Sequence, residues 1–372
     1  MRNVLVTGAK GFIGRNLLAH LARMDDVEVF RYDLENSEAE LKDWLGRADV
    51  VFHLAGINRP QSEDEYQSGN ADFTKHICEI LRQAGRTPKI VMSSSIQAEM
   101  DNPYGVSKRN AEEALKTFAR ETGAAVVIYR LKNVFGKWCR PNYNSVTATF
   151  CHNIAHNLPI SISDPAREVE LVYVDDVIER FLAELKDPAG PESCFAADTI
   201  PSTRIALSDL AGRIQVYHDM KSSLMVPDFS VRFNQCLYAT YLSYIEPDAR
   251  EYGLGIKSDA RGNLAEFIKS RHFGQIFVSR THPGITRGNH YHHTKTEKFF
   301  VIAGEGLIRM RHIEGGAVVE YRVRGEEYRV VDIPPGHTHS ITNVGQEEMI
   351  TLFWASEVFN PDRPDTHFLE VS

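Results

Sequence analysis

The stretch Val4-Leu5-Val6-Thr7-Gly8-Ala9-Lys10-Gly11-Phe12-Ile13-Gly14 joins a short apolar run to a glycine-rich turn, and apolar residues at helical spacing follow at 17–22. A buried strand, a glycine turn and a helix form the context in which such a motif binds a dinucleotide. Gly8 allows the tight turn, Gly11 lets a pyrophosphate approach the backbone, and Gly14 lets the helix pack on the strand. The stretch therefore predicts a Rossmann-type, doubly wound α/β domain with a parallel sheet.

A second stretch, at residues 93–108, carries the groups expected to do the chemistry. Ser93-Ser94-Ser95 follows an apolar run that is typical of a buried strand, so its hydroxyls belong at the carboxyl edge of the sheet. Tyr104 and Lys108 are four residues apart and share one helix face if Asn102-Pro103 opens a helix. We expect the Lys108 ammonium to lower the pKa of Tyr104 from its reference near ~10. Tyr104 can then exchange a proton with a carbonyl or alcohol oxygen that Ser95 also holds.

The residues after the second predicted strand bear on which dinucleotide binds. The strand pattern at 27–30 is followed by Arg31-Tyr32-Asp33. An acid at this point binds the ribose hydroxyls of NAD, whereas an arginine accepts the 2′-phosphate of NADP. Arg31 comes first, and Asp33 can start the next turn or cap a helix at 37–45. We expect NADPH, with a solvated Arg31 as the alternative.

A third buried strand, at residues 50–53, ends in the small-residue turn Leu54-Ala55-Gly56. Such a turn lets the backbone approach the cofactor, whereas His53 is interpreted as a packed strand residue. We expect the cofactor to be bound by residues that gather at the carboxyl ends of the strands. They are Gly8, Gly11, Phe12, Ile13, Gly14, Arg31, Leu54, Ala55, Gly56, Ser93, Tyr104 and Lys108.

Composition excludes several classes of function. With 372 residues the chain is long enough for two domains, and its net charge of −8 argues against general nucleic-acid binding. The sequence has no signal-peptide pattern at its start, and no apolar run approaches the ~20 residues of a membrane span. The five cysteines are widely spaced, without metal-finger or redox spacing. We expect reduced core thiols in a cytoplasmic protein.

These stretches resemble the extended short-chain dehydrogenase/reductase family over most of residues 1–200. The resemblance also rests on Arg130-x-x-Asn133-Val134-Phe135-Gly136 and on Val172-Tyr173-Val174-Asp175-Asp176-Val177. It implies that Ser95 and Tyr104 contact the substrate oxygen and that Lys108 contacts both Tyr104 and the nicotinamide ribose. It further implies a nucleotide-linked sugar near four residues: Asn133, Lys137, Trp138 and Arg140. A surface loop is the alternative for the last three.

From about Leu254 the pattern changes to short strands with glycine turns every eight to twelve residues, which is typical of a sandwich or barrel. The preceding residues, 201–250, mix helical and polar patterns, and Pro247 marks the expected boundary. We therefore expect a reductase domain at 1–246 and an all-β domain at 247–372.

Two histidine motifs in this second domain indicate a metal site. Gly284-x5-His290-x-His292-x4-Glu297-x6-Gly304 comes first, and Pro334-x-Gly336-x-x-His339-x3-Asn343 follows. In a strand, the first two histidines point to the same face, and the carboxylate and third imidazole complete a ligand set for a divalent metal, expected to be Zn²⁺. The predicted ligands are His290, His292, Glu297 and His339. The spacing matches the two motifs of the cupin (jelly-roll) family, apart from a missing glycine just before Pro334.

The whole chain closely resembles the CapF family of capsular polysaccharide enzymes and their O-antigen homologues. Asp259-x-Arg261-Gly262-x-Leu264-x-Glu266-Phe267 resembles a motif of cupin-type deoxysugar epimerases. The CapF resemblance rests on the domain order and on Asn102-Pro103-Tyr104-Gly105, Gly136-Lys137-Trp138-Cys139, Pro141-Asn142-Tyr143-Asn144-Ser145, Gly288-Asn289-His290 and Pro364-Asp365-Thr366. It implies a homodimeric, bifunctional enzyme on the route to UDP-N-acetyl-L-fucosamine. The cupin would epimerise C3 of a UDP-4-keto-6-deoxy-N-acetylhexosamine. The reductase would then reduce C4 with NADPH, giving UDP-2-acetamido-2,6-dideoxy-L-talose.

Two other interpretations remain open. One is a single-activity nucleotide-sugar reductase or C4 epimerase whose cupin only binds sugar or supports the dimer; consumption of NADPH would exclude a C4 epimerase, which recycles its cofactor. The other is a redox-sensing or sugar-sensing binding protein. Ser95, Tyr104 and Lys108 argue against a sensor, which has no need of them.

Overall fold

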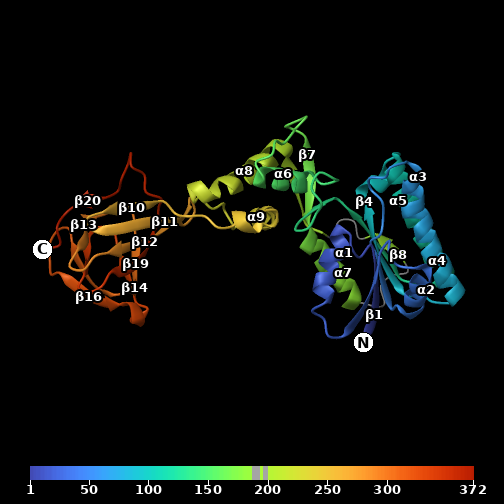
Figure 1. Cartoon of the computed structure of the whole chain (residues 1–372), viewed down its shortest axis with the longest axis horizontal. Coiled ribbons are helices and arrows are strands. Elements are labelled where there is room, and N and C mark those ends of the chain that lie inside the picture. The colour runs from blue at the N-terminus through green and yellow to red at the C-terminus, as the bar shows by residue number, and fades with distance from the viewer. Residues whose placement is uncertain (187–192, 196–199) are drawn as a thin grey trace. The chain divides into compact units, whose positions relative to one another are not determined.

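The computed structural model describes residues 1–186, 193–195 and 200–372, and it divides the chain into two compact units (Figure 1). The first unit comprises Met1–Gln215 and Gln235–Ile245. The second comprises Val216–Asn234 and Glu246–Ser372. The chain thus passes into the second unit at residue 216, returns to the first at 235 and leaves it again after Ile245. In the described residues, no helix is both long and apolar enough to cross a membrane.

The first unit is built on a six-stranded parallel sheet of strand order β2-β1-β3-β4-β5-β8. The strands are β1 (Arg2–Thr7), β2 (Val27–Tyr32), β3 (Val50–His53), β4 (Lys89–Ser95), β5 (Val126–Leu131) and β8 (Ser193–Phe195). The order reverses between β1 and β3, and ligands bind open α/β sheets at the carboxyl ends of strands at such a switch point. The predicted Rossmann-type fold is therefore confirmed.

Helices cover both faces of this sheet, as the doubly wound pattern predicts. One face is packed by α1 (Phe12–Leu21) and α7 (Val174–Lys186), through residues such as Leu17 and Phe181. The other is packed by α2 (Glu38–Arg47), α4 (Phe73–Ala84) and α5 (Pro103–Thr122), through residues such as Leu41 and Phe118. Two of these helices begin at side-chain caps: Ser37 forms a capping box with Glu40, and Asn102 accepts a bond from the Gly105 amide. The N-cap of α2 is Ser37, so Asp33 does not cap that helix. Asp33 starts the next turn instead, which was the other alternative, because its carbonyl oxygen accepts from the Asn36 amide at 3.0 Å.

Shorter elements complete the first unit and the connection onward. Between β3 and β4 lie α3 (Asp64–Tyr66) and a π-helix, η1 (Gln67–Asp72), and the 3₁₀-helix η2 (Ile96–Glu99) follows β4. A small sheet is formed by β6 (Asn133–Phe135), β7 (Glu168–Tyr173) and β9 (Ser202–Ala206). The remaining helices are α6 (Val146–Ala155), α8 (Leu207–Ser223) and α9 (Arg232–Leu242). Residues 201–250 are thus largely helical, because two apolar-faced helices occupy most of that stretch.

The second unit consists mainly of two antiparallel sheets, as predicted for a cupin. The first has the order β10 (Ile256–Asp259), β11 (Gly262–Ser270), β12 (Gly274–Thr281), β19 (Met349–Ala355), β14 (Glu297–Ala303) and β17 (Val330–Ile333). The second has the order β16 (Val319–Arg324), β15 (Glu305–His312), β18 (His337–Asn343), β13 (Thr286–Tyr291) and β20 (His367–Phe368). Their apolar faces share one core that includes Phe299, Ile308, Ile341 and Phe353.

Cysteines 78, 139, 151 and 236 are buried free thiols, as expected. The side chain of Cys194 lies outside the described residues. Burial raises the pKa of Cys78 to about 12, so this thiol stays protonated at neutral pH and has a structural role in the core.

Candidate functional site

The predicted dinucleotide loop lies at the switch point between β1 and β3. Gly8 has a φ of +68°, a left-handed conformation that glycine adopts without strain. A Cβ on Gly8 would lie 2.7 Å from the amide nitrogen of Ala55, so the turn after β3 packs directly against the turn after β1. A Cβ on Gly14 would lie 2.2 Å from the carbonyl oxygen of Gly8. Glycine at positions 8 and 14 is thus required for the two turns to meet and for α1 to start where it does.

The start of α1 fits the phosphates of a dinucleotide. Its N-cap is Gly11, and no side chain caps the helix. The amide groups of the first turn therefore have no side-chain cap, and the helix N-terminus favours an anion. The glycines, Phe12 and Ile13 together form a cradle that fits a dinucleotide pyrophosphate. When bound, the cofactor would supply a hydride to an adjacent carbonyl carbon.

Arg31 and Asp33, the two residues that could decide which dinucleotide binds, differ in their contacts: Arg31 is exposed and Asp33 is hydrogen-bonded. Arg31 is exposed near the end of β2, paired in register with Val6 of β1. The carboxylate of Asp33 accepts hydrogen bonds from the Lys10 amide at 2.6 Å and from its neighbour Leu34 at 2.9 Å. Asp33 therefore braces the glycine loop.

Tyr104 lies at the start of α5, where the Asn102 cap and Pro103 begin the helix. Its pKa is raised, because burial outweighs the opposing effect of a hydrogen bond with Ser95. The expectation that the pKa of Tyr104 is lowered was wrong: it is raised, and the Lys108 Nζ donates to the carbonyl oxygen of Ser93 at 3.1 Å. The phenol of Tyr104 is therefore protonated at neutral pH and adjacent to Ser95, as a proton donor needs to be.

Lys108 is the buried cation of this site and is only 6% exposed. Burial lowers its pKa to about 8, against an opposing contribution from Glu112. A Cβ on Gly56 would lie 3.0 Å from Lys108 Nζ, so the turn after β3 reaches α5. Asn70 of the π-helix also links the turn after β3 to α5, because it forms hydrogen bonds with the Ile57 backbone and with the Ser107 hydroxyl. π-Helical turns occur frequently at functional sites.

His53 is confirmed as a structural residue. Its two ring nitrogens lie 2.8 Å from Thr7 Oγ1 and 2.9 Å from Thr74 Oγ1. Burial, reinforced by the charge of Lys108, lowers its pKa to about 3. A neutral imidazole so enclosed ties β3 to β1 and α4.

The four residues predicted to lie near the sugar nucleotide make different contacts within the protein. Lys137 forms an ion pair with Asp175 at 2.9 Å, and Asn133 donates to the Glu170 carbonyl. Trp138 is 42% exposed and has a φ of +70°, and the Arg15 guanidinium lies 5.1 Å from its ring centre. Arg140 and Arg59 lie 5.0 and 5.8 Å from the ring centre of Tyr143. The loop 136–143 thus lies against the first turns of α1 and presents arginines and aromatic rings.

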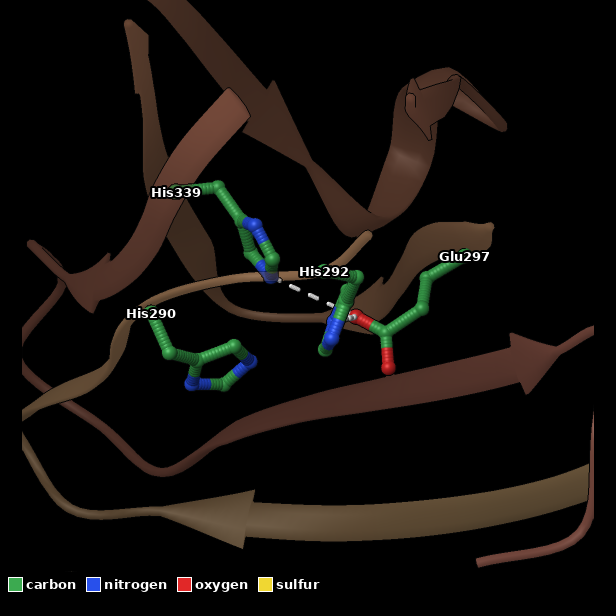
Figure 2. Close-up of side chains that lie close together, drawn as sticks. All are labelled: His290, His292, Glu297 and His339. Carbon is green, nitrogen blue, oxygen red and sulfur yellow. Dashed lines mark ion pairs between the residues drawn. The ribbon is translucent and has the colours of Figure 1, made fainter. Parts of the chain in front are cut away.

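In the second unit, the four predicted metal ligands converge (Figure 2). One donor atom from each of His290, His292, Glu297 and His339 lies within 4.8 Å of the others. Three elements supply them: β13 with the residue after it, the start of β14, and β18. His290 and His339 are paired in the register of β13 and β18, with ring centres 4.6 Å apart.

The chemistry of this cluster fits a divalent cation. Glu297 Oε2 lies 3.3 Å from Nε2 of both His292 and His339, and these two buried nitrogens have no hydrogen-bond partner in the described residues. Their other ring nitrogens face backbone carbonyls, of Asp365 and His337 respectively, which is the usual orientation of metal-binding imidazoles. Burial and the neighbouring His339 lower the pKa of His290 to about 4, so its ring is in the neutral form that binds metals. Zn²⁺ suits such a set, with room for a further ligand.

A cavity of about 460 Å³ opens beside this cluster. His290 and Glu297 line it together with Phe277, Phe299 and Phe353, so part of its lining is aromatic. Four cations also line it: Lys257, Arg261, Arg287 and Lys295. Lys257 and Arg261 have side chains that are 68% and 53% exposed, whereas Lys295 is buried. Glu266 also lines the cavity, 3.5 Å from Lys257 Nζ, so the cavity suits a molecule that has apolar parts and polar parts able to pair with charged side chains.

Sequence reasoning missed two residues of these sites. Glu112 is fully buried one helical turn after Lys108, and the four-residue spacing from Tyr104 to Lys108 to Glu112 is a signal that could have found it. The second is Asp365, which the sequence pointed to only as part of Pro364-Asp365-Thr366, one of the stretches that resemble the CapF family. Its carboxylate accepts hydrogen bonds from the amides of His293, Thr294 and Lys295, which lie between two of the candidate metal ligands, at 2.8, 2.8 and 2.9 Å. No local spacing predicts a contact across some seventy residues.

Comparisons with known proteins agree with this geometry. Residues 4–193 match the NAD dependent epimerase/dehydratase family, and residues 257–367 match the polysaccharide biosynthesis C-terminal domain. The chain is 43% identical over 368 residues to a UDP-2-acetamido-2,6-beta-L-arabino-hexul-4-ose reductase of Pseudomonas aeruginosa strain PA103, covering 99% of this chain and 98% of the relative.

Solved structures agree as well. The crystal structure of the capsular polysaccharide assembling protein CapF from Staphylococcus aureus is similar, with a TM-score of 0.90, 42% identity and coverage of 99% of this chain and 100% of that one. A UDP-glucuronic acid 4-epimerase from Bacillus cereus in complex with NAD shares only the fold of the first unit, with a TM-score of 0.51, 20% identity and coverage of 57% of this chain and 83% of that one.

Fold and sites together define a protein of the NAD-dependent epimerase/dehydratase class that carries an additional antiparallel β domain with a candidate metal site. More narrowly, the chain belongs to the family of the capsular polysaccharide protein CapF.

Proposed function

We propose that this chain is an NADPH-dependent reductase of a UDP-linked 4-keto-6-deoxy-N-acetylhexosamine that also epimerises C3 of that sugar. The product would be UDP-2-acetamido-2,6-dideoxy-L-talose, on the route to UDP-N-acetyl-L-fucosamine for capsule or O-antigen. The observation that carries the reductase is the protonated Tyr104 beside Ser95, in a chain 43% identical, nearly end to end, to a hexul-4-ose reductase.

In this proposal, the first unit provides the proton and the binding groups for reduction. Tyr104 gives its phenolic proton to the C4 oxygen, and Ser95 donates a hydrogen bond to the same oxygen. Lys108 holds the nicotinamide ribose, and Arg31 selects the 2′-phosphate of NADPH. Asn133 at the start of β6 and the loop with Lys137, Trp138 and Arg140 lie near the nucleotide-sugar.

In the same proposal, the second unit inverts C3. The hydrogen on C3 is acidic because C3 is adjacent to the C4 ketone. A cation held by His290, His292, Glu297 and His339 would act as a Lewis acid that stabilises negative charge on the ketone oxygen. The cavity supports this assignment because it places cationic and apolar side chains beside the ligand cluster. Burial and the adjacent Arg261 lower the pKa of Arg287, Asp259 opposes that shift, and an anionic substrate group would act in the same direction as Asp259.

We also propose that the activities divide between residues 1–246 and 247–372 and that the chain works as a homodimer. Light scattering of the purified chain at several concentrations tests the dimer. A monomeric mass across that range would overturn it.

One experiment tests the two activities together. The full chain is incubated in deuterated water with NADPH and a panel of UDP-4-keto-6-deoxy-N-acetylhexosamines, and the products are solved by NMR. We expect deuterium at C3, an inverted C3 centre and one NADPH consumed per reduced sugar. Reduction without C3 exchange would instead indicate a single-activity reductase with a structural or sugar-binding cupin. Absence of net NADPH consumption, with C4 inversion, would indicate a C4 epimerase.

A further inference from the structure

A buried acid, Glu112, lies beneath the catalytic residues, and the reduction as described does not use it. It is fully buried on α5, one helical turn after Lys108. Ser94, the residue before Ser95, donates from its hydroxyl to Glu112 Oε1 at 2.5 Å. Burying a carboxylate is costly unless it is paired and hydrogen-bonded, so its position calls for an explanation.

Arg130 of β5 is the pairing partner of this carboxylate. Its Nε donates to Glu112 Oε1 at 3.0 Å and its Nη2 to Oε2 at 2.6 Å, which is a bidentate pair. A second, exposed carboxylate, Glu99, lies 3.0 Å from Nη1 of the same arginine. Arg130 therefore has a buried acidic partner, Glu112, and an exposed one, Glu99. Glu112 also accepts a hydrogen bond from Ser94, next to Ser95.

Glu112 is connected to Ser95, Tyr104 and Lys108 in two ways, through a hydrogen bond to Ser94 and through its negative charge. Through Ser94 it fixes the end of β4, from which the Ser93 carbonyl accepts the Lys108 bond and Ser95 reaches Tyr104. Through its charge it opposes the effect of burial on Lys108, since Glu112 is the group that favours the ammonium form of this lysine.

We propose that Glu112 is a positioning residue for the reduction, which holds the end of β4 in place through Ser94 and places a carboxylate one helical turn from Lys108. The inference rests on the proposed reductase function. It differs from a purely structural role, in which the Glu112–Arg130 pair would only join α5 to β5.

The charged and titratable groups around Lys108 make the charge effect testable. On its own helix these are Tyr104, which is protonated, and Glu112. On β3 it is His53, which is neutral, and on β5 it is Arg130, which is paired with Glu112. Asn70 of the π-helix, the packing partner of Gly56, is uncharged. Glu112 is thus the acid among these groups.

The test compares Glu112→Gln with Glu99→Gln in the full chain. The first change keeps an acceptor for the Ser94 hydroxyl but removes the charge near Lys108, whereas the second removes the exposed partner of Arg130 alone. A group that stabilises the ammonium raises its pKa, so removing that group lowers the pKa from its value of about 8. We expect the basic limb of the kcat profile to move to lower pH by about one unit or more in Glu112→Gln and to stay in place in Glu99→Gln.

A second readout separates this inference from the proposed reaction. The affinity for NADPH, measured by fluorescence against pH without any sugar, should show the same shift, since Lys108 holds the ribose. If the wild-type chain reduces no ketosugar, the proposed function fails, and the NADPH titration still tests Glu112. Should Glu112→Gln fail to fold, Ser94→Ala, which removes the hydroxyl that links Glu112 to the end of β4, is measured in its place for the rate of reduction and for NADPH affinity. An unshifted pH profile in folded Glu112→Gln, or wild-type rate and affinity in Ser94→Ala where Glu112→Gln does not fold, would overturn the inference.

Discussion

The ring of His292 donates from Nδ1 to the backbone carbonyl oxygen of Asp365, a residue that lies more than seventy positions further along the chain. Asp365 belongs to the C-terminal segment, and its carboxylate also binds the backbone of the loop between His292 and Glu297. One residue thus orients an imidazole through its carbonyl and holds the adjoining loop through its carboxylate. Outer contacts of this kind fix the geometry of metal ligands.

Asp365→Asn should weaken metal retention. The amide presents an NH₂ group where one carboxylate oxygen now accepts backbone N–H bonds, so the loop between the ligands loosens. Loss of such an outer contact typically lowers metal affinity ~10–100-fold. The check is metal content per chain after dialysis against a graded series of chelator concentrations. Asp362→Asn, an exposed acid of the same segment, is the control. Equal retention by the two variants would contradict the role of Asp365.

His290→Ala should abolish deuterium incorporation at C3 while sparing reduction of ketone that is already epimerised. The imidazole is one of the four proposed ligands, and a cation on the site would stabilise the charge that develops on the ketone oxygen. NMR of the sugar after incubation in deuterated water measures the exchange. His293→Ala, which alters an exposed neighbouring ring, should exchange normally. Folded, metal-free His290→Ala protein that exchanges C3 at the wild-type rate would show that the metal has no part in this step.

Tyr104→Phe should lose reduction and keep NADPH binding nearly intact, because the phenol supplies a proton and contributes little to holding the cofactor. A general acid is typically worth ~10²–10⁴ in rate. Stopped-flow measurement of NADPH oxidation gives the rate, and fluorescence titration gives the affinity. Wild-type turnover by this variant would remove Tyr104 from the mechanism.

Arg31→Ala should reduce the affinity for NADPH and leave that for NADH largely unchanged. A charge-assisted contact with the 2′-phosphate is worth roughly 1.5–3 kcal/mol, or about 10–150-fold in affinity. Titration with both cofactors measures the ratio. If the affinity for NADPH is unaltered, another residue is the selector, and the Lys10 side chain in the glycine loop is the next to test.

The sequence by itself determined the two folds and the identity of the local motifs. Alternating and continuous apolar runs predict strands. The glycines at positions 8 and 14 predict the tight turn before α1, and the structure shows that a Cβ at either position would clash with the neighbouring backbone. The four candidate metal ligands could also be found, because side chains two apart on a strand share a face and both motifs lie on short strands of one domain.

Only the tertiary structure decided the pKa values and the hydrogen-bond partners of these groups. The spacing of Tyr104 and Lys108 predicted a lowered pKa for the phenol, but burial raises that pKa, and Lys108 is directed to the Ser93 carbonyl. The roles of Glu112 and Asp365 depend on contacts with Arg130 and His292, from elements distant in the sequence. Spacing along one helix or strand sets which side chains share a face. Desolvation and the pairing of charges depend on every element that packs around them, so they follow only from the folded chain.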